Sequence, residues 1–272
     1  MEDGWTRVGK GKGKPPAFVH GINPPMRDMT VEKIRVEFDS KMKRWRTSSC
    51  RKQVQNILDR QRPDEGWQIG NAVCLATASF SRDNWQCRQR SLLQIVAFID
   101  IVRHLQSGQS TKILCYAQEP EYTPLDKKFL ASIGVTALEL ELASDSLSLG
   151  AAAQHLNKTA FVFEPFMDLG LESMRELFGA DVRLYIGSSM QRWIDDSNLN
   201  NAEIMSDLQE SFKGRGATIN ADNIEHVRAQ SRQATDFVHS RRSFRFPRFE
   251  EDPNVFEGLS IYWKEPQDEA DV

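Results

Sequence analysis

Carboxylates and hydroxyls that could do chemistry stand directly after short apolar runs of this 272-residue chain. Glu119 and Glu164 each follow such a run, and Ser79, Ser81 and Ser188 follow others. If the runs are parallel strands, their carboxyl ends meet along one edge of a sheet. There, two carboxylates can act as acid and base or hold a cation, and hydroxyls can bind an anion. Carboxylates at strand ends are more often solvated or helix-capping, so both interpretations stay open.

Several well-defined chemistries are disfavoured. The chain contains neither a phosphate-binding GxxxxGK[ST] loop nor a GxSxG nucleophile motif. Ala76 and Ala78 occupy the first strand–helix turn, where a dinucleotide-binding fold carries glycines, although Thr77, Ser79 and Ser81 still offer hydroxyls to a phosphate. The four cysteines form no CxxC pair, and the five histidines are scattered. We therefore expect no cofactor, no metal ion and no assignable catalytic residue, and the sequence alone establishes no reaction.

The elements that must position these residues can be predicted from hydropathy. Continuous apolar runs separated by helical stretches are typical of strands that are buried on both faces of a parallel sheet. Such runs cover 71–78, 112–117, 159–163 and 182–186, and an alternating run over 136–142 suggests an edge strand. The intervening segments at 88–106, 124–133, 147–155 and 169–178 are expected to be helical. The prediction is an α/β fold of Rossmann-like type, with a mostly parallel five-stranded sheet and helices on both faces.

The flanking regions differ in composition from this body. Residues 1–29 are rich in Gly, Lys and Pro and are expected to be a disordered basic tail, whereas 30–62 carry two helical stripes and form a predicted helical arm. Residues 66–195 would be the α/β domain, and 196–272 a helical extension with an acidic tail. Residues 1–62 hold 15 Lys and Arg against 7 Asp and Glu, whereas the rest of the chain is acidic. A basic arm on an acidic body favours an acidic partner, and a solvated helix face is the simpler alternative.

Two basic segments raise the possibility of nucleic-acid binding. One is the Lys10–Lys14 tract, and the other is Arg241–Arg248, in which arginines alternate with Phe244 and Phe246. The alternative for the second segment is that Phe244, Phe246 and Phe249 fix it to the domain while the arginines stay in water. We favour this alternative, because the acidic tail that follows would repel phosphates. No apolar run is long enough to cross a membrane, and the start of the chain lacks a secretory signal, so we expect a location in the cytoplasm or nucleus.

The order of short motifs resembles the SRR-like family, named after the plant protein "sensitivity to red light reduced". The resemblance covers about 66–195 best, and the chain would be a divergent, fungal-type member. It is carried by motifs at the strand ends and on the first helix of the domain: Cys74–Ser81, Arg90–Gln94, Tyr116–Pro120, Leu130–Gly134, Phe161–Phe166 and Tyr185–Ser189. The Asp-Gly-Trp-Thr opening at 3–6 is also typical.

The resemblance implies a Rossmann-like domain and an intracellular regulatory role. The family is linked with light and circadian signalling in plants, and with cytoskeletal or haem-related regulation elsewhere. Where the family has glycines, an Asp-Pro and a Pro-His, this chain has Ala76 and Ala78, Glu119-Pro120 and Pro165-Phe166. These departures weaken any catalytic or metal role of the strand-end crevice.

We therefore expect a non-enzymatic regulatory protein that acts through a protein partner, using the crevice and the basic arm. The second hypothesis is a small-molecule sensor or enzyme with Ser79 on an anion and Glu119 as acid–base group. The third is nucleic-acid binding. The candidate ligand-binding residues of the crevice are Ser79, Ser81, Gln94, Glu119, Pro120, Glu164 and Ser188.

Overall fold

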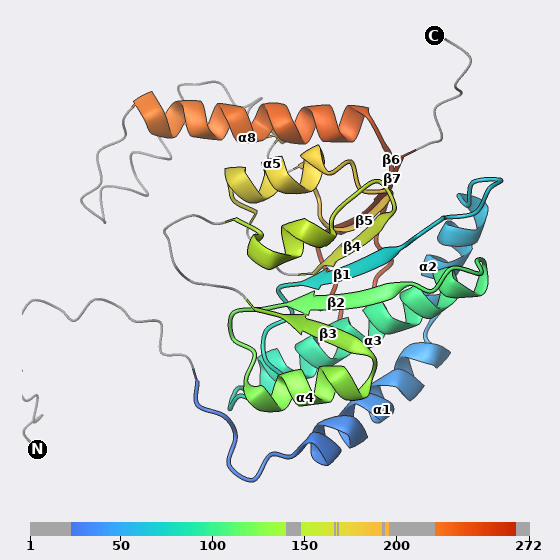
Figure 1. The fold of residues 1–272 in the computed structure, drawn as a ribbon, viewed down its shortest axis with the longest axis vertical. Coiled ribbons are helices and arrows are strands. Elements are labelled where there is room, and N and C mark those ends of the chain that lie inside the picture. The colour runs from blue at the N-terminus through green and yellow to red at the C-terminus, as the bar shows by residue number, and fades with distance from the viewer. Residues whose placement is uncertain are drawn as a thin grey trace, which may run out of the picture.

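A computed structural model describes residues 23–139, 148–165, 167, 169–191, 194–195 and 221–264. Its centre is a mixed seven-stranded sheet with the order β3-β2-β1-β4-β5-β7-β6 (Figure 1). The strands are β1 Asn71–Leu75, β2 Leu114–Gln118, β3 Val135–Leu138, β4 Ala160–Glu164, β5 Leu184–Ser188, β6 Arg242–Arg245 and β7 Leu259–Trp263. The helices are α1 Val31–Thr47, α2 Ser49–Arg60, α3 Trp85–Ser107, α4 Pro124–Ser132, η1 Gly150–His155, α5 Leu171–Gly179 and α8 Ala221–His239.

The five predicted strands form and run parallel from β3 to β5, but the prediction of a five-stranded sheet is wrong. β7 pairs with β5 antiparallel, and β6 pairs with β7 antiparallel, so the sheet is larger and mixed. The residues of β7, Leu259–Trp263, were predicted to be part of an acidic tail. All five are buried, because the strand lies inside the sheet between β5 and β6.

Helices cover both faces of the sheet and enclose two apolar cores (Figure 1). One core lies under α1, α2, α3 and α4, and the other lies under η1, α5 and α8. The helix α3 supplies many side chains to the first core, including Leu92, Val96 and Phe98, which explains its broad apolar surface. No helix in the described part of the chain is both long enough and apolar enough to cross a membrane.

The predicted helical arm packs against this core. Ile34, Phe38 and Trp45 of α1 are buried with exposed fractions of 2% or less. The Trp45 indole donates a hydrogen bond to Asp100 of α3 over 3.1 Å, and Arg51 of α2 forms an ion pair of 2.7 Å with the same carboxylate. The arm is therefore held by apolar burial and by a polar anchor, and its inner face is not available to a partner.

The division of the chain into a domain at 66–195 and an extension at 196–272 stays a prediction. Strands β6 and β7 come from the latter region and complete the sheet beside β5. The helix α8 lies in the predicted helical extension. The predicted disordered tail at 1–29 lies outside the described residues as far as residue 22, as do the Lys10–Lys14 tract and the polar stretch at 196–220.

Candidate functional site

The carboxyl ends of β1, β2 and β4 lie together at one edge of the sheet. β1 pairs with β2 on one side, with Leu75 opposite Gln118, and with β4 on the other side, with Cys74 opposite Phe163. Glu119 and Glu164 therefore stand on either side of the end of β1. This places the predicted strand-end residues Ser79, Glu119 and Glu164 along the same edge of the sheet, as expected for a parallel arrangement.

The turn after β1 is closed by hydrogen bonds from its own hydroxyls and amides. The Ser79 hydroxyl donates to a carboxylate oxygen of Asp126 over 2.6 Å, and the Phe80 amide donates to the other oxygen over 3.2 Å. The Ser81 and Thr123 hydroxyls lie 2.7 Å apart. Ser79 and Ser81 are 3% and 0% exposed, so both predicted anion-binding hydroxyls are consumed by internal bonds.

The backbone of this turn is strained. Ala76 and Ala78 have φ angles of 53° and 57°, in the left-handed region where a Cβ atom is disfavoured. The predicted strand 71–78 ends at Leu75 for this reason. Alanine thus occupies two positions whose conformation suits glycine, at a cost of about 1 kcal/mol each.

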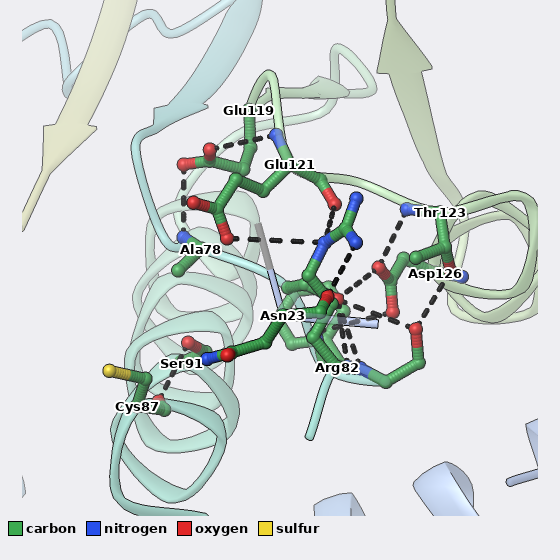
Figure 2. A network of polar contacts seen from close by, with 12 residues as sticks. Asn23, Ala78, Arg82, Cys87, Ser91, Glu119, Glu121, Thr123 and Asp126 are labelled. Carbon is green, nitrogen blue, oxygen red and sulfur yellow. Dashed lines mark hydrogen bonds and ion pairs between the residues drawn. The ribbon is translucent and has the colours of Figure 1, made fainter. Parts of the chain in front are cut away.

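Glu119 fixes the strained turn. One of its carboxylate oxygens accepts the Ala78 amide over 3.0 Å, and the other accepts the Glu121 amide over 3.0 Å (Figure 2). Burial raises the pKa of Glu119, while these two amide bonds act in the opposite direction. The Glu119 side chain therefore connects the ends of β1 and β2 by hydrogen bonds. Its carboxylate already accepts the Ala78 amide, which an anion at this turn would have to bind.

Asp126 and Arg82 complete the network shown in Figure 2. Asp126 is fully buried and also accepts the Thr123 amide over 2.8 Å, which makes a reciprocal capping box at the start of α4. Arg82 donates to the carbonyl oxygens of Glu121, over 2.9 Å, and Asn23, over 2.7 Å. The network joins the β1 turn, the β2–α4 loop and the segment before α1.

Glu164 belongs to a second, separate network. Its carboxylate accepts the Tyr185 hydroxyl over 2.7 Å and the Ser188 amide over 3.0 Å, and it also accepts the Met167 amide. Complete burial raises the pKa of Glu164 to about 7, although each of these hydrogen bonds lowers it. Glu164 and Ser188, two of the candidate ligand-binding residues, are thus brought together, with an oxygen–oxygen distance of 3.5 Å between carboxylate and hydroxyl.

The carboxylates of Glu119 and Glu164 do not share a hydrogen-bond partner among the described residues. Cys74, the last but one residue of β1, lies close enough to both for each to raise its pKa, although burial is the larger cause. The pKa of this thiol lies well above its usual value, so Cys74 stays protonated and is a core residue rather than a nucleophile.

Gln94 and Pro120 are placed away from these bonds. Gln94 is buried on α3, and its amide contacts the carbonyl oxygen of Val255 over 3.4 Å, on the side of the β6–β7 connection. Pro120 is exposed in the turn after β2. Their role as ligand-binding residues stays a prediction.

Asp126, Thr123 and Tyr185 were missed as parts of the strand-end edge. The first two could have been found, since Thr123-Pro124-Leu125-Asp126 has the spacing of a capping box with proline in the first helical turn. Tyr185 gives no such signal, because a tyrosine within an apolar strand is indistinguishable in sequence from a core residue.

The segment Arg241–Arg248 forms β6 and the loop after it. Phe246 and Phe249 are buried, as the favoured alternative expected, whereas Phe244 is 46% exposed and stacks on Trp263 with ring centroids 5.6 Å apart. Arg241 departs from that expectation: its side chain is 1% exposed and pairs with Asp181. Burial lowers the pKa of Arg241 to about 10. Phe246, Phe249 and the Arg241 side chain are therefore part of the interior, whereas Phe244 lies at the surface.

These features define a mixed α/β domain whose strand-end edge is cross-linked by its own carboxylates. The chain matches the SRR1 domain over residues 50–263, most of its length, and it belongs to that family. The resemblance seen in the sequence is thus confirmed, and the match extends through β6 and β7. No curated protein matches the chain.

Proposed function

We propose that this SRR1 domain protein is a regulatory protein of the cytoplasm or nucleus that acts by binding protein partners, and not by catalysis at the strand-end edge. The observation that carries the proposal is the internal use of the polar groups at that edge. Ser79, Ser81 and Glu119 all bond to neighbouring protein groups, and so does Asp126. Ser79, Ser81 and Asp126 are also buried, whereas a catalytic group needs a surface that a substrate can reach.

The same bonds argue against a phosphate ligand. In a Rossmann-like fold, a pyrophosphate binds the amides of the first strand–helix turn. Here the Ala78 amide bonds Glu119 and the Phe80 amide bonds Asp126. A phosphate at this turn would have to displace two carboxylates, and it would be repelled by both of them if they stayed in place.

Capture of partners by the tagged full chain, expressed in its own cells, tests the proposal. The expected result is one or more proteins that co-elute with the chain in a fixed ratio during size-exclusion chromatography. A variant that lacks residues 1–22 asks whether the basic tail contributes. Removal of 1–62 is unsuitable, because it would delete Ile34, Phe38 and Trp45 from the core. If the chain elutes as a free monomer and no protein co-elutes with it, the proposal is wrong.

Glu164 supports a second candidate, a site for an uncharged or weakly basic small molecule that would have to displace one of the donors now bonded to its carboxylate, from Tyr185, Ser188 and Met167. A buried carboxyl group whose pKa lies near 7, beside a strained turn, is typical of ligand-binding and catalytic sites. A thermal-shift screen of wild type and Glu164→Gln against metabolites tests this candidate. A compound that stabilises the wild type but not the variant supports it, whereas equal shifts or none oppose it.

A further inference from the structure

A groove lies between α2 and the segment that contains β6. Its volume is about 770 Å³. One wall is the exposed side of α2, and the other is formed by β6, the loop after it and the turn before β7. We call this surface the α2–β6 groove, and its main lining residues are Ile57, Arg60, Phe244, Arg245, Pro247 and Arg248.

β6 is the last strand of the sheet in the described part of the chain. Its four residues are all exposed, and β7 is its neighbour on one side. The Phe246 amide donates to the Leu259 carbonyl over 2.9 Å, in register with the pairing of β6 and β7. Because inward and outward main-chain groups alternate along an antiparallel strand, those of Ser243 and Arg245 face away from β7. A further strand can therefore add at this edge.

The chemistry of the groove selects the strand that would add. Arg60, Arg245 and Arg248 line it, and Glu257 is the one acidic residue among its lining residues. Phe244 lines the same groove with a ring that is 46% exposed. An extended segment that alternates carboxylates with apolar side chains would place acidic groups on the arginines and an apolar one on Phe244.

We infer that the α2–β6 groove binds an extended acidic peptide segment of a partner protein by adding it as a strand to β6. This rests on the proposed function, since it names the surface and the kind of partner. Main-chain hydrogen bonds to Ser243 and Arg245 provide part of the affinity, and the arginines select acidic sequences. A single-stranded nucleic acid would use the arginines and Phe244 but not the strand edge.

Fluorescence anisotropy with defined probes tests the inference on the full chain. The probes are capped eight-residue peptides that alternate Glu with Val or Phe, the same peptides with Lys in place of Glu, and an oligothymidine of twelve nucleotides. A fourth probe carries proline at every second position, which removes the amides needed for pairing. The acidic peptide is expected to bind best, and the lysine and proline forms at least tenfold more weakly.

Two variants separate charge from strand pairing. Arg245→Glu with Arg248→Glu should weaken binding of the acidic peptide at least tenfold, whereas the control Arg103→Glu with Lys128→Glu, at exposed positions outside the groove, should not. Ser243→Pro removes an outward amide without touching the ladder to β7, and should weaken binding severalfold, whereas Ser243→Ala should not. Thermal melting confirms that each variant is folded.

Tighter binding of the oligothymidine than of the acidic peptide, or equal binding of the proline-containing probe, overturns the inference. So does unchanged binding by the double arginine variant. These outcomes are distinguishable from failure of the proposed function: if the captured complex persists with Arg245→Glu and Arg248→Glu, the chain acts through partners but at another surface. If no complex is captured from its own cells, the proposed function itself fails.

Discussion

Replacement of Asp126 by alanine is expected to destabilise the fold strongly, because the carboxylate holds three donors from two segments of the strand-end edge. It accepts the Ser79 hydroxyl at 2.6 Å, the Thr123 amide at 2.8 Å and the Phe80 amide at 3.2 Å, and it is fully buried. Loss of a buried charged acceptor that leaves such donors unpaired costs about 3–5 kcal/mol. This would be a large part of the 5–15 kcal/mol by which a typical domain is stable.

Urea unfolding followed by circular dichroism measures this effect as a change in the free energy of unfolding. Asp126→Asn retains one acceptor oxygen and should cost about half as much, so it provides a reading if Asp126→Ala fails to fold. Glu139→Ala is the matched control, since its carboxylate is 75% exposed and pairs with Lys127 at the surface. It should cost less than about 1 kcal/mol. A loss below about 1 kcal/mol in Asp126→Ala would refute the reasoning that this carboxylate cross-links the edge.

Three further outcomes are expected. Burial gives Glu164 a pKa of about 7 in the fold against about 4.5 when unfolded, so its protonated form stabilises the native state. As pH rises from 4.5 to 7, the free energy of unfolding should therefore fall by about 3 kcal/mol more in wild type than in Glu164→Gln. Parallel pH profiles of the two proteins in urea melts would contradict this. Ala76→Gly and Ala78→Gly should each raise the free energy of unfolding by about 0.5–1 kcal/mol, because glycine relieves the strain of a positive φ. The control Ala131→Gly in α4 should lower it by about 1 kcal/mol. A lower stability in Ala76→Gly and Ala78→Gly would exclude strain at the turn. Trp45→Ala should lower the free energy of unfolding by about 3–5 kcal/mol, because it removes the contact between α1 and α3. Chemical unfolding measures this change. A loss below about 1 kcal/mol would mean that the helical arm is not part of the core.

The parallel part of the sheet could be predicted because each strand is a short apolar run between helical segments. β7 could not, since Leu259–Trp263 stands alone among acidic residues, and only its pairing with β5 and β6 explains its burial. The antiparallel partner of a strand is a long-range contact, and hydropathy along the chain does not specify which strand it is. β6 is likewise not marked by a continuous apolar run, because Phe244 is the one apolar residue among its four.

The position of the candidate edge was predictable, but its state was not. Glu119 and Ser79 follow strands β2 and β1, so their meeting at one edge follows from parallel topology. The Ser79 hydroxyl bonds to Asp126, and Glu119 bonds to the amide of Ala78 in the left-handed turn. Neither of these bonds can be predicted from the spacing of the apolar runs. The sequence therefore predicts Ser79 and Ser81 hydroxyls that are available to an anion, whereas in the structure both are hydrogen-bonded within the protein.

Quantitative capture of partners by three folded forms of the full chain tests the central claim most directly. The forms are wild type, Glu164→Gln at the strand-end edge, and the double variant Arg245→Glu with Arg248→Glu in the α2–β6 groove. We expect Glu164→Gln to retain the wild-type partners in wild-type yield, and the groove variant to lose at least nine-tenths of the recovered complex, a tenfold effect of reversing two charges. Loss of the partners in Glu164→Gln, with full recovery in the groove variant, would contradict the account.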